Sequence, residues 1–184
     1  MRRLPVIVLL AAAMAAPAFA QVGYKLKTRS IAELSAEQRQ VVGRWCRLDY
    51  DGLRLTPGAW EKFAPLTTMK SNPEFRGIQI VSRYQVLPSD RPSMEASVAY
   101  IVIGQFELGP GFTREPGKTT VNYRLTDRDG QLMIADIEPS RPHVSRQAAL
   151  AWLKQQREAT TNDADRMQID AAIQALSEPD QAAK

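Results

Sequence analysis

Four side chains in the strand-rich half of this chain could do chemistry together. Asp136 lies near the end of an apolar segment, where a carboxylate facing an apolar pocket would have a raised pKa and could act as a general base. Tyr84, Tyr100 and Tyr123 occupy inward-type positions on successive predicted strands, where they could line a ligand pocket. The alternatives are an aspartate that caps the next turn at the sheet rim, and core tyrosines whose hydroxyls reach water or backbone.

The single cysteine and the single histidine are expected to have structural roles. Cys46 lies on a predicted helix, and neighbouring arginines would lower its pKa only if they shared its helical face, which adjacent residues do not. A buried, inert thiol is therefore expected. His143 follows Pro142 in a predicted turn and is expected at the surface. One residue of each type excludes an intramolecular disulfide and the usual Cys/His zinc site within one chain.

The composition argues against a nucleic-acid partner and against a nucleotide cofactor. The 184 residues carry 24 Lys+Arg against 20 Asp+Glu, a formal charge of +4. Removing an N-terminal segment that holds Arg2 and Arg3 leaves +2, and the remaining basic residues are scattered along the chain. The sequence contains neither the G-x-G-x-x-G nor the G-x-x-x-x-G-K-[ST] phosphate-binding motif, so no cofactor is expected.

Residues 1–20 have the pattern of a secretory signal peptide. Arg2 and Arg3 form the positive n-region, residues 5–16 form an apolar h-region, and Ala18-Phe19-Ala20 is an A-x-A cleavage site. The apolar run is too short for a membrane-spanning helix, and no later stretch of the sequence could span a bilayer. We therefore expect a periplasmic or secreted protein that has no membrane association after cleavage.

The first part of the mature chain predicts two helices. A polar lead-in covers residues 21–34, and Ser35 with Gln38 forms a capping box that predicts a helix start. Asp51-Gly52 should end that helix. Thr56-Pro57 predicts the start of a second, short helix. The apolar spacing makes three aromatic side chains the expected anchors between helices and sheet: Trp45, Trp60 and Phe63.

Four strands are predicted next, over residues 75–87, 95–108, 119–126 and 131–137, and they form one antiparallel sheet. Gly104 inside the second strand indicates a bulge or bend. Residues 127–130 close a hairpin whose register decides the place of Asp136. An even-length loop puts Asp136 on the face of Tyr123, whereas an odd-length loop with a bulge moves it to the other face.

Two more helices are predicted after the sheet. Ser145 should cap the first, and residues 161–163 should cap the second, which ends before Pro179. The chain therefore divides into a main domain over residues 35–140, a helical extension over 141–178 and a tail over 179–184.

The order of elements resembles the NTF2-like cone of the cystatin-like superfamily. The resembling stretches are Glu37-Gln38-Arg39-Gln40-Val41-Val42-Gly43-Arg44-Trp45, Leu48-Asp49-Tyr50-Asp51-Gly52-Leu53, Trp60-Glu61-Lys62-Phe63 and the three strands that end in Ala135-Asp136-Ile137. The resemblance covers roughly residues 31–138 and rests on element order. It implies an α+β fold in which a curved antiparallel sheet packs against N-terminal helices, and the C-terminal helices are an addition to that pattern.

Two functions from different classes are compatible with this pattern. The favoured hypothesis is an exported, non-catalytic domain that binds a small apolar ligand or a protein partner. The alternative, which the resemblance suggests through the family's isomerases, is a small cofactor-free isomerase or hydratase that uses Asp136 as base in a cone pocket. In either case the predicted ligand-binding residues are Tyr84, Tyr100, Tyr123 and Asp136.

The predicted signal peptide can be tested directly. Because the three regions of a signal peptide are all present, we expect cleavage after Ala20 and a mature chain that begins at Gln21. Mass spectrometry of the intact exported protein measures this terminus. A protein that retains Met1 would contradict the prediction.

Overall fold

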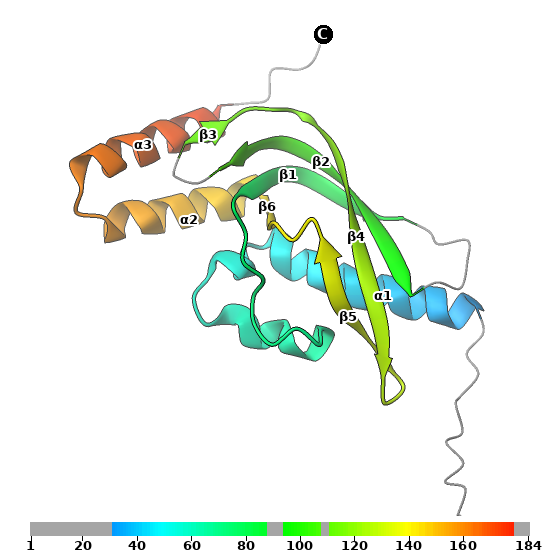
Figure 1. Ribbon diagram of the computed structural model, residues 1–184. Helices are drawn as coiled ribbons and strands as arrows, with labels where there is room; N and C mark the ends of the chain where they lie inside the picture. Colours follow the sequence, from blue (N-terminus) through cyan, green and yellow to red (C-terminus); the bar gives the residue numbers. More distant parts are fainter. Residues whose placement is uncertain (1–30, 88–93, 108–110, 179–184) are drawn as a thin grey trace, which may run out of the picture.

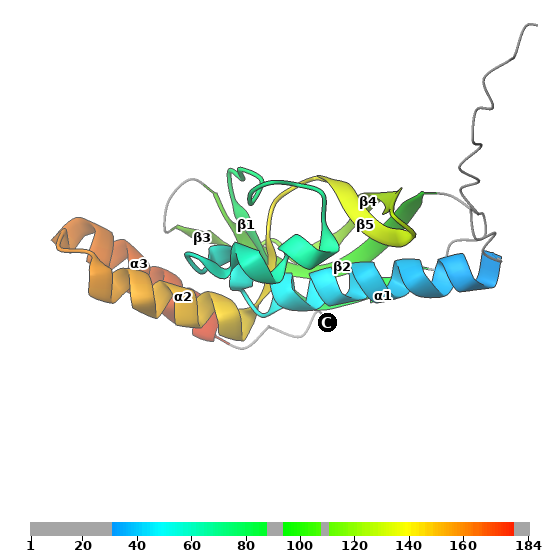
Figure 2. The ribbon, with the colours of Figure 1, turned by 90° about the horizontal axis from the view of Figure 1, so that it is seen from below.

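The computed structural model describes residues 31–87, 94–107 and 111–178. The predicted signal peptide, most of the lead-in, the loop over residues 88–93 and the tail over 179–184 lie outside the described residues. Within them, a long N-terminal helix lies against a strongly curled sheet, and two C-terminal helices project side by side beyond the end of that sheet (Figures 1 and 2). No helix among the described residues is both long and apolar enough to cross a bilayer.

The first helix, α1 (Ile31–Tyr50), begins before the predicted cap. Ser35 lies inside the helix, so the predicted start at Ser35 is wrong. The four residues before it contain no helix breaker, and one polar residue inside a helix costs too little to stop it. The predicted end is confirmed. Gly52 follows the helix with φ 81°, a left-handed conformation that glycine adopts at little steric cost.

Three short 3₁₀ turns replace the predicted second helix: η1 (Leu53–Leu55), η2 (Ala59–Lys62) and η3 (Ala64–Leu66). The helix predicted from Thr56-Pro57 does not form. Pro57, Gly58 and Pro65 interrupt the segment, and a proline within a helix removes a backbone donor and clashes with the preceding turn. The short turns still carry Trp60 and Phe63 to the predicted place beside α1.

The sheet has six strands: β1 (Ile78–Val86), β2 (Glu95–Phe106), β3 (Phe112–Thr113), β4 (Gly117–Arg128), β5 (Gln131–Glu138) and β6 (His143–Ser145). The main order is β5-β4-β2-β1-β6, and β3 pairs with β2. The predicted α+β class, with a curved sheet packed on an N-terminal helix and a helical extension, is confirmed. The long strands are antiparallel, and β6 adds a short parallel pairing to β1.

Two bulges bend the sheet where Gly104 predicted an irregularity. Ile80 pairs with Gly104 and Val81 with Val102, so Ile103 is an extra residue on β2. The next paired residue on β1 is Arg83, opposite Ile101, so Ser82 is an extra residue on β1. A Cβ on Gly104 would lie 2.4 Å from the Thr113 carbonyl oxygen, so β3 can approach only a glycine there.

The bulges divide the buried side chains into two cores. Below them, Tyr100 and Tyr123 pack against α1. Above them, Ile78 and Ile80 pack with Phe106 against α2 (Arg146–Ala159) and α3 (Asp163–Ser177), whose predicted caps are confirmed. The Ser145 hydroxyl accepts a hydrogen bond from the Ala148 amide, and the Asn162 side-chain Oδ1 accepts one from the Ala164 amide.

The three predicted aromatic anchors meet beside α1. Trp45 and Phe63 have no exposed surface, and their ring centroids lie 4.6 Å apart. Trp60 lies edge-on to Trp45 at 5.7 Å but is only partly buried. All three side chains contribute to the core, and their contributions should differ.

Phe63→Ala should destabilise the fold more than Trp60→Ala. Loss of the fully buried Phe63 ring should cost about 3–5 kcal/mol. Trp60 retains solvent contact, so its loss should cost about 1–2 kcal/mol. Urea denaturation followed by circular dichroism measures both values. An equal or larger loss for Trp60→Ala would contradict the burial difference.

Candidate functional site

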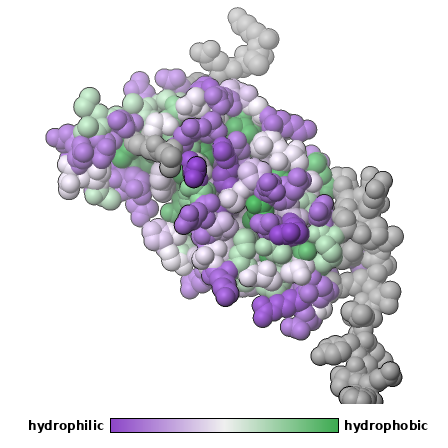
Figure 3. Space-filling view, in the orientation of Figure 1, coloured by the Kyte–Doolittle hydropathy of each residue, from purple (hydrophilic) through white to green (hydrophobic). Residues whose placement is uncertain are grey.

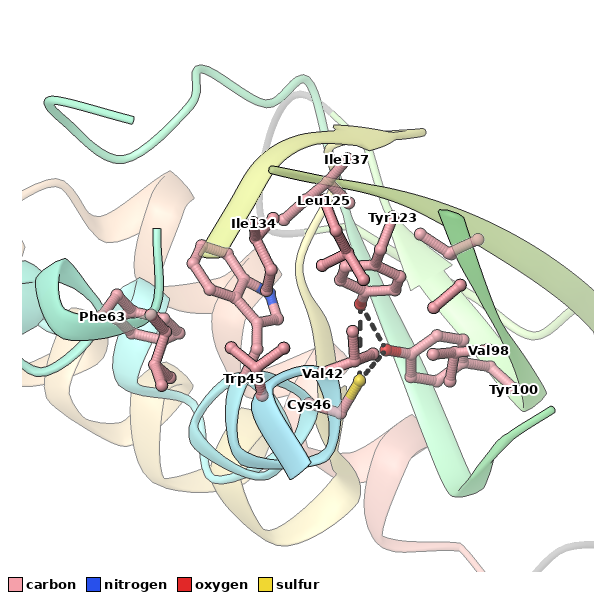
Figure 4. Packing of buried hydrophobic residues seen from close by; sticks show 14 of the residues in the cluster. Val42, Trp45, Cys46, Phe63, Val98, Tyr100, Tyr123, Leu125, Ile134 and Ile137 are labelled. Atoms are coloured by element: carbon pink, nitrogen blue, oxygen red, sulfur yellow. Dashed lines mark hydrogen bonds between the residues drawn. The ribbon is translucent and has the colours of Figure 1, made fainter. Parts of the chain in front are cut away.

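Two of the three predicted pocket tyrosines meet inside the curl of the sheet. Tyr100 on β2 and Tyr123 on β4 have hydroxyl oxygens 2.9 Å apart. The Cys46 Sγ of α1 lies 3.2 Å from the Tyr100 hydroxyl and 3.5 Å from that of Tyr123. Figure 4 shows the three groups pointing toward one another. Each of them can donate one hydrogen to the next, so together they can close a ring of hydrogen bonds.

Burial keeps all three groups of this ring protonated. Desolvation raises the pKa of the Cys46 thiol to about 12. It also raises the pKa values of Tyr100 and Tyr123 well above their ordinary value of 10. A protonated thiol is a poor nucleophile, and the ring contains no group that could act as a base near neutral pH. The expected burial of Cys46 is confirmed.

Tyr84 lies on the same face of the sheet but outside this ring. Its aromatic ring is tilted against those of Tyr50 and Tyr100, with centroid distances of 5.6 and 6.0 Å. It is only partly buried, and its desolvation raises the pKa of its hydroxyl. Tyr84 therefore closes the side of the core where α1 ends.

Asp136 does not join the tyrosines, and the predicted four-residue pocket does not form. The hairpin has the two-residue turn Asp129-Gly130, but a register shift then leaves Ala135 unpaired. This bulge turns Asp136 to the outer face, opposite Tyr123. There Asp136 pairs with Arg124 at 2.9 Å, and their side chains are 54% and 66% exposed.

Three charged or titratable residues that the sequence did not mark as functional gather beside the tyrosines instead. Asp49 on α1 and Arg54 on η1 have side chains that are each 1% exposed, and Arg54 Nη1 lies 3.8 Å from Asp49 Oδ2. Arg54 also donates to the Asn72 Oδ1 and to the Ser140 carbonyl, at 2.9 and 2.7 Å. The guanidinium therefore joins η1 to two loops and compensates the buried carboxylate.

His143 is the third member of this buried group, and its predicted place at the surface is wrong. It is 1% exposed, because β6 pairs with β1 on one side and contacts α1 on the other. Its imidazole stacks on the ring of Tyr100, with centroids 4.2 Å apart. Its backbone amide donates to Asp49 Oδ2 at 3.0 Å. The carboxylate thus attaches the start of the helical extension to α1.

Desolvation shifts the two buried titratable groups in opposite directions. It raises the pKa of Asp49 from 3.8 to about 6, and the charge of Arg54 only partly offsets this. It lowers the pKa of His143 from 6.5 to about 3, with Arg54 and Arg141 adding repulsion. Neither side chain is accessible, so a substrate could reach them only after the main chain opened. The cluster can hold the fold together but has no surface for catalysis.

A surface groove is a second candidate site. It lies between the helical extension and the end of β1 and β2, and encloses about 440 Å³. Its apolar lining comes from Phe75, Ile78, Phe106, Trp152, Leu153 and Ile169. We call it the helix–sheet groove. Gly77 allows the chain to pass close to β2, because a Cβ there would lie 2.6 Å from the Phe106 carbonyl oxygen.

The sequence contains a signal for one of the missed residues. Asp49 lies four residues after Trp45 and three after Cys46, so it shares their buried face of α1. A carboxylate on an apolar helical stripe is rare enough to suggest a buried partner. No comparable local signal marks His143 or the groove.

Among the residues that the structure describes, no three His, Cys, Asp or Glu side chains gather as a metal site would require.

Because the pKa shifts of Asp49 and His143 are opposed, their effects on the free energy of unfolding should largely cancel as pH changes. Replacing either residue should reveal the pH dependence that the other one causes. The raised pKa of Asp49 contributes stability fully below pH 3.8, and this is lost as pH rises through 6. The lowered pKa of His143 contributes stability fully above pH 6.5, and this is lost as pH falls through 3. Between about pH 4 and 6 the two slopes oppose each other.

In that window Asp49→Asn should become more stable as pH rises, and His143→Gln should become less stable, each by about 1 kcal/mol per pH unit. Urea titrations from pH 4 to 6.5 measure the slopes. Asp136→Asn, in an exposed pair, is the matched control and should keep the wild-type profile. Slopes of the same sign in both core variants would contradict the assignment.

Comparison with known proteins adds no match: no family model, no curated protein and no solved structure matches this chain.

Proposed function

We propose that this protein is a non-catalytic binding domain that takes a small apolar ligand in the helix–sheet groove. The observation that carries the proposal is the groove itself, an apolar concavity with polar residues at its rim. Small-molecule sites are typically concave, about 300–1,000 Å³ in volume, and lined by aromatic and aliphatic side chains with a few polar groups. The volume of about 440 Å³ falls within that range.

The interior of the curled sheet is a poor alternative place for a ligand. Trp45, Tyr100 and Tyr123 fill it, and each is at most 1% exposed. Their hydroxyl and thiol partners are already hydrogen-bonded to one another, so an entering ligand would have to replace those bonds. Tyr100 and Tyr123, which were predicted to bind a ligand, are therefore better explained as core residues. The proposed binding site is the helix–sheet groove instead.

The groove has the chemistry of a ligand site. Trp152 of α2 lies edge-on to Phe106 of β2, with centroids 6.0 Å apart, and both line the groove. Gln156 and Asp165 stand at the rim as exposed polar groups. An apolar molecule with one polar end could bury its body against the aromatic rings and leave that end at the rim.

The face seen in Figure 3 is largely hydrophilic, with hydrophobic residues in small separate areas.

A small ligand fits this groove better than a protein partner does. A stable protein interface typically covers about 800 Å² on each side, far more than a groove of this size offers. The isomerase or hydratase alternative loses its base, since Asp136 is exposed and paired with Arg124 on the outer face. Binding without catalysis is the function that these contacts favour.

Two further parts of the proposal concern family and compartment. An N-terminal helix that lies against a curled sheet supports membership of the NTF2-like superfamily, because this order of elements resembles that fold. The pattern of residues 1–20 supports export to the periplasm or medium. An exported binding domain would meet its ligand outside the cytoplasm.

Nile red, an uncharged fluorescent probe of apolar sites, tests the groove. It should bind the wild type saturably, because the groove offers the aromatic side chains of Phe75, Phe106 and Trp152. Gln156→Trp should weaken binding at least tenfold, because the new ring fills the groove from an exposed position. Gln155→Trp is the matched control. Gln155 is exposed on the same helix but does not line the groove, so its variant should bind as the wild type does.

Circular dichroism should show that both tryptophan variants keep the wild-type fold. Equal loss of binding in the two variants, or no saturable binding by the wild type, would contradict the proposed site.

A further inference from the structure

The outer face of the sheet, opposite α1, carries an apolar strip between two cations. The strand registers place Arg83, Ile101 and Lys118 in one row across β1, β2 and β4. The next cross-strand pair on this face is Gln85 of β1 opposite Ala99 of β2. Neighbouring strands lie about 4.8 Å apart, so the backbones of Arg83 and Lys118 are roughly 10 Å apart with Ile101 between them. Both long side chains can therefore reach a group bound above Ile101.

This row lies in a depression of the surface with an apolar floor. The depression encloses about 460 Å³, and Leu87, Ala99 and Ile101 contribute to its lining. Ala99 is only 7% exposed and Ile101 is half-buried, whereas both cations are exposed. The aliphatic stems of such cations commonly cover apolar surface while the charged ends stay in water. Here they form the walls beside the apolar strip.

The two cations lack compensating acids in the described part of the chain. No described Asp or Glu forms an ion pair with Arg83 or Lys118, and no acidic residue is among those that line the depression. By contrast Arg124, further along β4, pairs with Asp136 at 2.9 Å. The depression therefore presents positive charge above an apolar floor, which is complementary to an anion that has an apolar body.

The geometry points to a binding site for a small aliphatic carboxylate on this face, independent of the helix–sheet groove. The carboxylate lies between Arg83 and Lys118, and the aliphatic chain lies along Ile101 and Ala99. Arg83 can donate two parallel hydrogen bonds to the carboxylate oxygens, and Lys118 adds a point charge from the other side. The volume of about 460 Å³ suits a small molecule.

Calorimetric titration with octanoate, below its micelle concentration, tests this site. Octanoate should bind the wild type at this site more tightly than 1-octanol or octylamine does, because only the carboxylate complements the two cations. Arg83→Gln and Lys118→Gln should each lower the affinity for octanoate about three- to tenfold, and the double variant should lower it further. Arg128→Gln, an exposed cation at the other end of β4, is the matched control and should bind as the wild type does.

The apolar part of the site is tested with Ile101→Ser, which should also weaken octanoate binding. Raising the salt concentration should weaken binding to the wild type more than to the double variant, because exposed charges are screened. Gln156→Trp, which fills the helix–sheet groove, should leave unchanged the part of octanoate binding that depends on Arg83 and Lys118. Failure of the carboxylate site and failure of the groove are therefore separate results.

Three results would overturn the inference. The first is octanoate binding that the Arg83→Gln, Lys118→Gln double variant leaves unchanged. The second is octylamine binding as tightly as octanoate. The third is the absence of octanoate binding to the folded wild type.

Discussion

The two bulges between β1 and β2 are the constraint on which the architecture depends. A strand presents alternate side chains to its two faces, so a regular pair of strands would keep one apolar set on one face throughout. The extra residues Ser82 and Ile103 reverse that alternation partway along the pair. Val81 and Tyr100 then pack toward α1, while Ile80 and Phe106 pack toward the helical extension. One sheet thus supplies two separate cores, and the helix–sheet groove exists because the second core ends at the edge of β1 and β2.

A buried carboxylate joins these two halves. Asp49 accepts a hydrogen bond from the backbone of β6 and faces Arg54, so it connects α1, the turn that follows it, and the strand that leads into α2. Such a carboxylate is costly to desolvate, and a buried ion pair is weak evidence for stability by itself. The role that its hydrogen bonds support is to position β6 against α1. The short strand β6 has only three paired residues, and the hydrogen bond to Asp49 helps to fix where the helical extension begins.

Features that depend on local chemistry could be predicted from the sequence. The caps at Ser145 and Asn162, the helix end at Gly52 and the irregularity at Gly104 all follow from a few adjacent residues. The place of Asp136 could not be predicted in this way. The two-residue turn was compatible with an inward aspartate, but the bulge at Ala135 reversed its side. His143 was missed for a related reason, since its burial depends on α1, almost a hundred residues earlier in the chain. A groove between two distant elements leaves no pattern in a single sequence.

The ring formed by Cys46, Tyr100 and Tyr123 has a consequence if the protein leaves the reducing cytoplasm, as we propose. Outside it, an accessible lone thiol tends to be oxidised or to form a disulfide with another molecule. Thiol–disulfide exchange requires a thiolate that can reach its target. The Cys46 sulfur is protonated and enclosed by two phenol hydroxyls, so it meets neither requirement. The same hydrogen bonds that fill the core therefore give the folded chain resistance to covalent dimerisation and mixed-disulfide formation, although it has no second cysteine with which to pair.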